Sequence, residues 1–259
     1  METWLFIVAG GLAAGVFGSL LGLGGGILIV PLLTLGLGIP LRDAVGVSLI
    51  CVAATSAASG AVYLRSGAAD LRLAMTLELF SAAGAIVGGV IAFALDERWL
   101  AALFAALLLG VALSMVRRRA ADATDVSGSV TARDKPPRRL RLGAAGGIAG
   151  GIASGVLGIG GGIVLVPLMH MVMGLPLRVA AATSGVMIAV TASAGGIVYL
   201  VRGGIEPYVL APTALGVFIG AMTGARVAPR VDLRILRALF VVVLGYLALR
   251  MLGRALGLT

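Results

Sequence analysis

The sequence predicts an all-α protein that crosses a membrane many times and consists of two copies of one unit. Hydrophobic residues make up 60% of the 259 positions and charged residues only 12%, whereas soluble domains carry about a quarter charged residues. Apolar runs follow one another along the whole chain, so we expect the surrounding solvent to be a lipid bilayer. A glycine-rich segment occurs twice, which indicates an internal duplication.

The two glycine-rich segments align without a gap at an offset of 136 positions. Residues 22–31 read GLGGGILIVP, and residues 158–167 read GIGGGIVLVP. The correspondence continues downstream, where Ser48 matches Ser184. Paired interruptions in the apolar segments of two repeats are the best sequence indication of a binding site in a membrane transporter.

Each copy contains five apolar segments, the last three of which reach or approach the ~20 residues that a membrane-spanning helix needs. The second segment has about 14 residues and would rise only about 21 Å. We therefore predict that the first two segments of each copy form a hairpin broken at the glycines. The segments of the first copy (residues 1–116) are roughly 4–21, 25–38, 43–64, 71–95 and 99–116. Those of the second copy (residues 142–259) are roughly 142–157, 162–175, 179–201, 207–228 and 233–252.

Residues 117–141 are the only long polar stretch and form a predicted linker between the copies. This stretch carries eight arginine or lysine residues against three aspartates, and such an excess is typical of cytoplasmic loops. The formal net charge of +9 is thus explained by loops that face anionic lipid, and nucleic-acid binding is not expected.

The charges of the other loops predict that the two copies are inverted in the membrane. The stretch 226–237 is more basic than its counterpart 96–98, and the other two loop pairs also differ in charge. The more basic member of every pair lies on the cytoplasmic side only if each copy crosses the membrane an odd number of times. Both chain termini would then lie outside.

The glycine segments are predicted to bind a small anion. Glycine permits positive φ and the close approach of a ligand, and irregular backbone at membrane depth occurs only where it is buried in protein or lines a cavity. The helix after each segment would begin with unpaired N–H groups that attract anions. A turn packed for structure alone is the alternative. The candidate residues are Gly24, Gly25, Gly26, Gly160, Gly161 and Gly162.

Hydroxyl side chains follow one face of the third segment in each copy. They are candidates to donate hydrogen bonds to an oxyanion, or else to bond between helices or to their own helix. The duplicated pair Ser48 and Ser184 is favoured, with Thr183 beside the second serine. Thr55 and Thr191 are candidates for a polar lining.

Charged residues supply two further candidates. Arg42 and Arg178 occupy matched positions and would form an anion vestibule or anchor the helices at the membrane interface. Glu78 lies inside an apolar segment and is matched by Ala214. An intramembrane carboxylate is a functional hypothesis by default, so Glu78 would carry a coupling proton, or else reach the cytoplasmic interface.

Glycines at four-residue spacing predict close helix–helix contacts. They are Gly11, Gly15, Gly84, Gly88, Gly147, Gly151, Gly220 and Gly224. No group of histidine, cysteine and acidic residues has the spacing of a metal site, and no nucleophile–base arrangement is present. We therefore predict no metal, no cofactor and no catalytic residue.

These motifs resemble the TauE/SafE family of sulfite and organosulfonate exporters, also called the toluene sulfonate uptake permease family. The resemblance rests on the doubled Gly-x-Gly-Gly-Gly-x4-Pro, the Pro-Leu-Arg that follows it, Ala-Thr-Ser at 182–184, and GAVYL and GIVYL at 60–64 and 196–200. The first copy departs from the family at Val47, where a hydroxyl residue usually precedes the serine. The resemblance implies secondary transport of small sulfur-containing oxyanions across a prokaryotic plasma membrane.

The sequence thus predicts a permease that binds a small anion between its repeats and works by rocking one repeat against the other. The lipid bilayer is an expected partner, while a coupling proton or sodium ion and a homodimer stay open. One alternative is a non-transporting membrane scaffold, in which the glycine segments would pack tightly. The other is an intramembrane enzyme, in which His170 would converge with Glu78 or Cys51.

Overall fold

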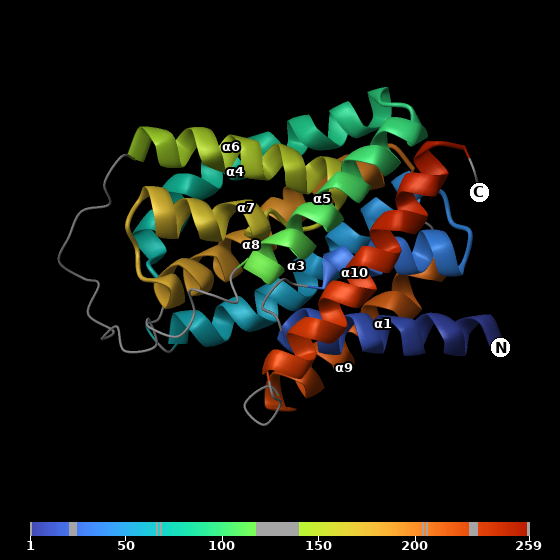
Figure 1. The fold of residues 1–259 in the computed structure, drawn as a ribbon. Coiled ribbons are helices and arrows are strands. Elements are labelled where there is room, and N and C mark those ends of the chain that lie inside the picture. Colours follow the sequence, from blue (N-terminus) through green and yellow to red (C-terminus); the bar gives the residue numbers. More distant parts are fainter. Residues whose placement is uncertain are drawn as a thin grey trace.

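The computed structural model describes residues 2–20, 25–65, 67, 69–117, 140–203, 205, 207–227 and 233–257. These residues form helices joined by turns, and no strand occurs among them (Figure 1). The predicted linker falls almost wholly outside the described residues, which stop at Arg117 and resume at Leu140. Gly24 also lies outside them.

Both copies contain the same succession of helices, which confirms the predicted segments. The first copy has α1 (Glu2–Leu20), α2 (Gly26–Pro31), the π-helix η1 (Leu32–Gly36), α3 (Leu41–Arg65), α4 (Leu71–Ala94) and α5 (Glu97–Arg117). The second copy has α6 (Leu140–Leu157), α7 (Gly162–Pro167), the π-helix η3 (Leu168–Val172), α8 (Leu177–Val201), α9 (Pro207–Val227) and α10 (Leu233–Ala255).

Helices α3, α4, α5, α8 and α9 are long and apolar enough to cross a membrane. The second helix of each copy is short, as predicted, and changes from α to π geometry directly after Pro31 or Pro167. Proline has no N–H to donate and its ring disturbs the preceding helical turn, which accounts for the change at this point. The chain is therefore an all-α polytopic membrane protein.

The two copies interlock through glycine-lined helix contacts. Helix α1 packs along α9, and α4 packs along α6. The first helix of each copy therefore packs against the fourth helix of the other. A Cβ atom on Gly15 would lie 2.3 Å from the Val217 carbonyl oxygen, and one on Gly151 would lie 2.0 Å from that of Ser81. These contacts confirm the predicted role of the spaced glycines, because any larger residue would force the backbones apart.

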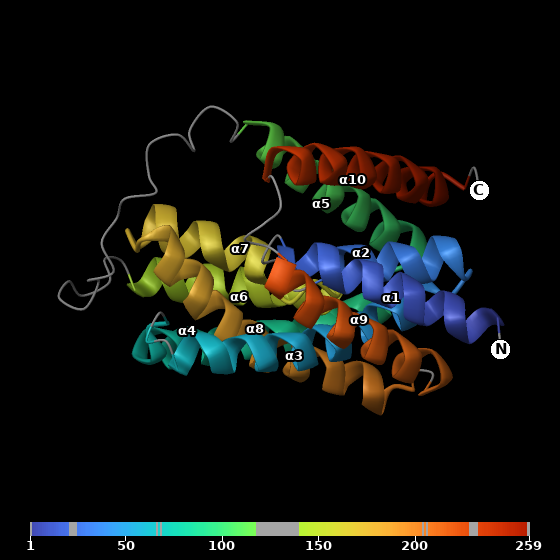
Figure 2. The same cartoon turned by 90° about the horizontal axis from the view of Figure 1, so that it is seen from below.

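Helices α3 and α8, the third helices of the two copies, pack against each other in opposite directions. Gly196 on α8 faces Leu49 near the start of α3, whereas Gly185 near the start of α8 faces Tyr63 near the end of α3. Both chain termini lie at one end of the bundle, and the end of α5 and the start of α6 lie at the other (Figure 2). Helices α5 and α10 pack together along one side of the bundle (Figure 2).

Candidate functional site

The glycine segments form turns that only glycine adopts without strain. Gly25 caps α2 with a φ of 78°, and Gly161 caps α7 with a φ of 75°. Gly158 and Gly160 also have positive φ values of 72° and 78°. Residues with a Cβ atom rarely adopt this region, so the backbone of these turns depends on the repeated glycines.

Ser48 ties the two glycine segments together. Its buried hydroxyl donates a hydrogen bond of 2.7 Å to the Gly158 carbonyl oxygen and lies 3.4 Å from that of Gly26. The segments touch here, since a Cβ atom on Gly26 would lie 2.6 Å from the Gly158 oxygen. In this conformation the hydroxyl of Ser48 therefore donates its hydrogen bond to a backbone carbonyl of the other copy.

Ser184, the counterpart of Ser48, has a different environment. It is 1% exposed, and its hydroxyl has no hydrogen-bond partner among the described residues. The hydroxyl oxygen lies 3.5 Å from the position of a Cβ atom on Gly162. Ser154, which is 0% exposed, also has an unpartnered hydroxyl within the described chain, and its Cβ lies 3.5 Å from the Cβ position of Gly161. Two unpaired hydroxyls thus flank consecutive glycines of one turn.

The structure does not bring Ser48 and Ser184 together. Ser48 is next to Leu49, which faces Gly195 and Gly196 on α8, whereas Ser184 lies 11 to 12 positions earlier on that helix. At 1.5 Å per residue the two serines are roughly 17 Å apart along α8. Apolar side chains occupy the space between the two serines. Gly160 packs there against Val52 of α3 and Ile188 of α8.

The hydroxyls of Thr183 and Thr55, which were also predicted to line the site, form hydrogen bonds within the protein. Thr183 accepts a 2.9 Å hydrogen bond from the Asp70 backbone N–H at the start of α4, so it points away from the glycine turn. Thr55 bonds back to the carbonyl oxygens of Cys51 and Val52 in its own helix.

Glu78 belongs to a polar cluster between α4 and α8. Its Oε1 accepts a 2.8 Å hydrogen bond from the Thr191 hydroxyl, and the same hydroxyl lies 3.0 Å from that of Ser81. The buried Oε2 atom has no partner among the described residues. Glu78 therefore faces the neighbouring helix instead of reaching toward the interface.

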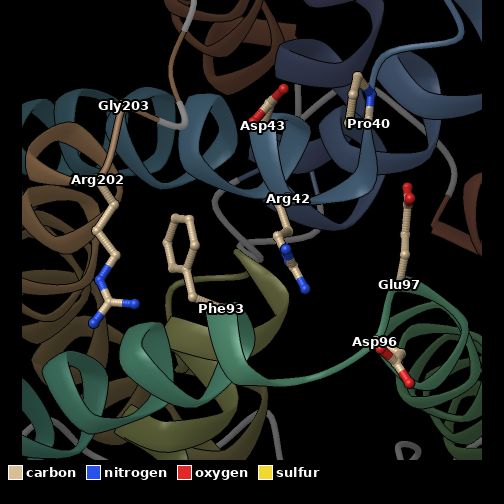
Figure 3. A pocket seen from close by; sticks show the side chains of 8 residues that line it. All are labelled: Pro40, Arg42, Asp43, Phe93, Asp96, Glu97, Arg202 and Gly203. Atoms are coloured by element: carbon tan, nitrogen blue, oxygen red, sulfur yellow. The ribbon is translucent and has the colours of Figure 1, made fainter.

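Arg42 lines a pocket of about 340 Å³ formed by the start of α3, the end of α4, the start of α5 and the residues after α8. Its guanidinium donates to the carbonyl oxygens of Ala92, at 3.2 Å, and Leu95, so the arginine ties α3 to the end of α4. Arg42 and Arg202 lie on two sides of the Phe93 ring, at 5.9 and 5.2 Å from its centre (Figure 3).

The pocket carries both signs of charge. Besides the two arginines it is lined by Pro40, Asp43, Phe93, Asp96, Glu97 and Gly203. Arg178 does not belong to it, because α8 runs antiparallel to α3 and begins at the opposite end. The side chain of Arg178 lies outside the described part of the chain.

The sequence places this architecture among known proteins. The sequence model of the family described as "Sulfite exporter TauE/SafE" matches residues 7–251. The chain belongs to the TauE/SafE family. TauE/SafE proteins are membrane transporters, so the chain is a multi-pass membrane transporter and not an enzyme.

Similar TauE/SafE-type proteins occur in bacteria and archaea. YunE of Bacillus subtilis (strain 168), a probable membrane transporter protein, is 25% identical over 241 residues, which cover 87% of this chain and 88% of YunE. A probable membrane transporter protein of Methanocaldococcus jannaschii is 28% identical over 259 residues, which cover 93% of this chain and 92% of that protein. No solved structure matches the chain.

Membership of the TauE/SafE family decides between the three functional alternatives. The enzyme alternative required His170 to converge with Glu78 or Cys51, but His170 bonds to the Leu175 carbonyl oxygen at 2.8 Å, and Cys51 is buried in α3. The glycine turns do pack tightly, as the scaffold alternative expected, yet the family consists of transporters.

Three residues of the described sites were not predicted from the sequence. Ser154 is matched by Gly18, so comparison of the two copies did not indicate a hydroxyl at this position. Ser81 lies three positions after Glu78, a spacing that places two residues on one helix face, and it could have been found in this way. Arg202 follows α8, and its position beside Phe93 depends on tertiary packing.

Proposed function

We propose that this transporter moves small sulfur-containing oxyanions, such as sulfite and sulfonates, across a prokaryotic plasma membrane. The family description names sulfite export, while the names of the relatives refer only to membrane transport. The observation that carries the proposal is the pair of buried, unpaired hydroxyls of Ser154 and Ser184 beside Gly161 and Gly162. Leaving buried hydroxyls unpaired costs about 1–3 kcal/mol each, and an oxyanion would accept from both.

The proposed binding position lies at the start of α7. The first N–H groups of a helix have no partner within it, and the hydroxyls of Ser154 and Ser184 add donors on two sides. Ser48 contributes indirectly in this conformation, because it fixes the Gly158 carbonyl. Gly25 and Gly26 form the matching turn of the first copy, which packs against Gly158.

We propose that the copies are inverted in the membrane, with the linker in the cytoplasm and both termini outside. The antiparallel packing of α3 and α8 supports this arrangement, because a two-fold axis in the membrane plane reverses equivalent helices. The position of both termini at the end opposite the end of α5 and the start of α6 is also consistent with it.

Tags attached at residue 128 and at the two termini test this orientation. In intact cells we expect an impermeant reagent to reach the terminal tags and to reach the tag at residue 128 only after the membrane is opened. Termini that become accessible only on lysis would contradict the inverted arrangement.

Alternating access is the proposed mechanism, but the moving units would not be the two repeats. Rocking one repeat against the other would separate α1 from α9 and α4 from α6, where backbones touch at glycines. Helix α9 also packs on α3, and α4 packs on α8. We infer that α1 moves together with α9 and that α4 moves together with α6.

Purified protein in liposomes tests the proposed substrate class. We expect ethanesulfonate and sulfite to exchange across the membrane at least tenfold faster than in empty liposomes, with chloride and acetate near the empty-liposome rate. Both directions of movement are measured, since an exporter and an importer each catalyse exchange. Equal rates for all four anions, or no protein-dependent exchange of either sulfur compound, would refute the proposal.

A further inference from the structure

Glu78 is the only acidic side chain, within the described residues, that lies in the interior of a helix and not in its first turn. It sits seven residues after Leu71, about 10 Å along α4. One carboxyl oxygen is bonded to Thr191, and the other is buried without a partner among the described residues. Ionisable groups inside a membrane span are costly and are retained where they have a function.

The second copy shows that the fold does not require this polar cluster. Helix α4 packs on α8, and the equivalent helix α9 packs on α3. The positions that match Glu78 and Ser81 hold Ala214 and Val217. The threonine that matches Thr191 bonds only to carbonyl oxygens of its own helix. The same helix pairing thus forms in one copy with a carboxyl group and in the other without one.

The surroundings of Glu78 contain few other titratable groups. The ionisable residues of α3, α6 and α8, the helices packed against α4, are Arg42, Asp43, Cys51, Tyr63, Arg65, Arg141, Arg178, Tyr199 and Arg202, the last being the residue that caps α8. All except the buried Cys51 lie near the ends of their helices. Arg72, which lies six residues earlier on α4 itself, is exposed. The described hydrogen bonds of Glu78 involve only the Thr191 hydroxyl.

We propose that Glu78, whose carboxyl group accepts a hydrogen bond from Thr191, binds the proton whose movement drives transport of the anion. The proton binds to a carboxylate oxygen and leaves from the same group, so no further reactant is needed. Thr191 follows Ser184 by seven residues, which places both on one face of α8 about 10 Å apart. Protonation and anion binding would therefore act on the same helix. This inference rests on the proposed function, namely transport of a small anion.

The variant Glu78→Gln tests the proposal, because its amide keeps an acceptor for Thr191 but does not titrate. Liposomes holding the purified protein are assayed with ethanesulfonate, whose charge does not change near neutral pH. With an imposed pH gradient, we expect wild type to accumulate the anion and Glu78→Gln to lose at least 90% of this accumulation. Without a gradient, exchange of ethanesulfonate should stay within about threefold of wild type, which also shows that the variant is folded.

Matched threonine variants separate coupling from packing. Thr191→Val removes the bond to Glu78, and we expect it to lower gradient-driven accumulation several-fold. Thr213→Val is the control, because Thr213 is equally buried but bonds only to the Val209 carbonyl of its own helix. Accumulation by this control should match wild type.

Three other results would contradict the proton site, and a fourth would contradict the proposed function. Full accumulation by Glu78→Gln, or accumulation by wild type that follows a sodium gradient and not a pH gradient, overturns the proton site. Loss of both accumulation and exchange in folded Glu78→Gln assigns the carboxyl group to anion binding, which also overturns it. Failure of wild type to exchange ethanesulfonate or sulfite refutes the proposed function instead.

Discussion

Replacing Gly151 with alanine is expected to destabilise the protein more than any other single-methyl change. The added Cβ atom would lie 2.0 Å from the Ser81 carbonyl oxygen and 2.9 Å from the Ala85 nitrogen. Both are backbone atoms of a helix, so relief requires α4 and α6 to separate. Overpacked cores commonly lose about 1–3 kcal/mol, and we expect at least the upper value here. Thermal unfolding of the purified protein in detergent, followed by size-exclusion chromatography, measures the effect.

Gly110→Ala is the matched control for this change. Gly110 lies within α5, and a Cβ atom there would meet no other heavy atom within 4 Å. Alanine favours a helix interior by about 1 kcal/mol relative to glycine, so this variant should be as stable as wild type or slightly more stable. If Gly151→Ala and Gly110→Ala unfold at the same temperature, the close contact between α4 and α6 is not formed in the protein.

The helices could be predicted from the sequence because their signals are local. The lengths of the apolar runs and the positions of the glycine segments gave the hairpins, and the four-residue spacing of Gly84 and Gly88 indicated close helix contacts. The partner of each glycine face is a tertiary property, however. Gly84 faces Ile148 of the other copy, and nothing in the spacing identifies that partner. The prediction that one repeat rocks against the other was made without knowledge of these partners.

The candidate site shows a second limit of repeat alignment. Ser48 and Ser184 are equivalent in sequence, so sequence reasoning gave them one role. In the structure the first donates to Gly158, while the second has no partner among the described residues. The two copies also differ at positions outside the motif, where Ser154 is matched by Gly18 and Glu78 by Ala214. Function in a duplicated transporter is therefore best sought where the two copies differ.

Alanine variants of the two equivalent serines are expected to fail in different ways. Ser184→Ala removes an unpaired hydroxyl from the proposed anion site, so we expect exchange of ethanesulfonate to fall at least tenfold with little change in thermal stability. Loss of one hydrogen bond to a charged group is worth about 1.5–3 kcal/mol, which corresponds to this range. Ser154→Ala should behave similarly.

Ser48→Ala should instead lower stability, because it leaves the buried Gly158 carbonyl without its donor at a cost of about 1–3 kcal/mol. The comparison therefore has two readouts for each variant, the melting temperature and the exchange rate. The Ser48 hydroxyl donates to backbone here, so the loss of stability should exceed any specific loss of anion affinity. Wild-type exchange kinetics in both Ser154→Ala and Ser184→Ala would remove these hydroxyls from the binding site. An unchanged melting temperature in Ser48→Ala would show that its bond to Gly158 contributes nothing measurable to the fold.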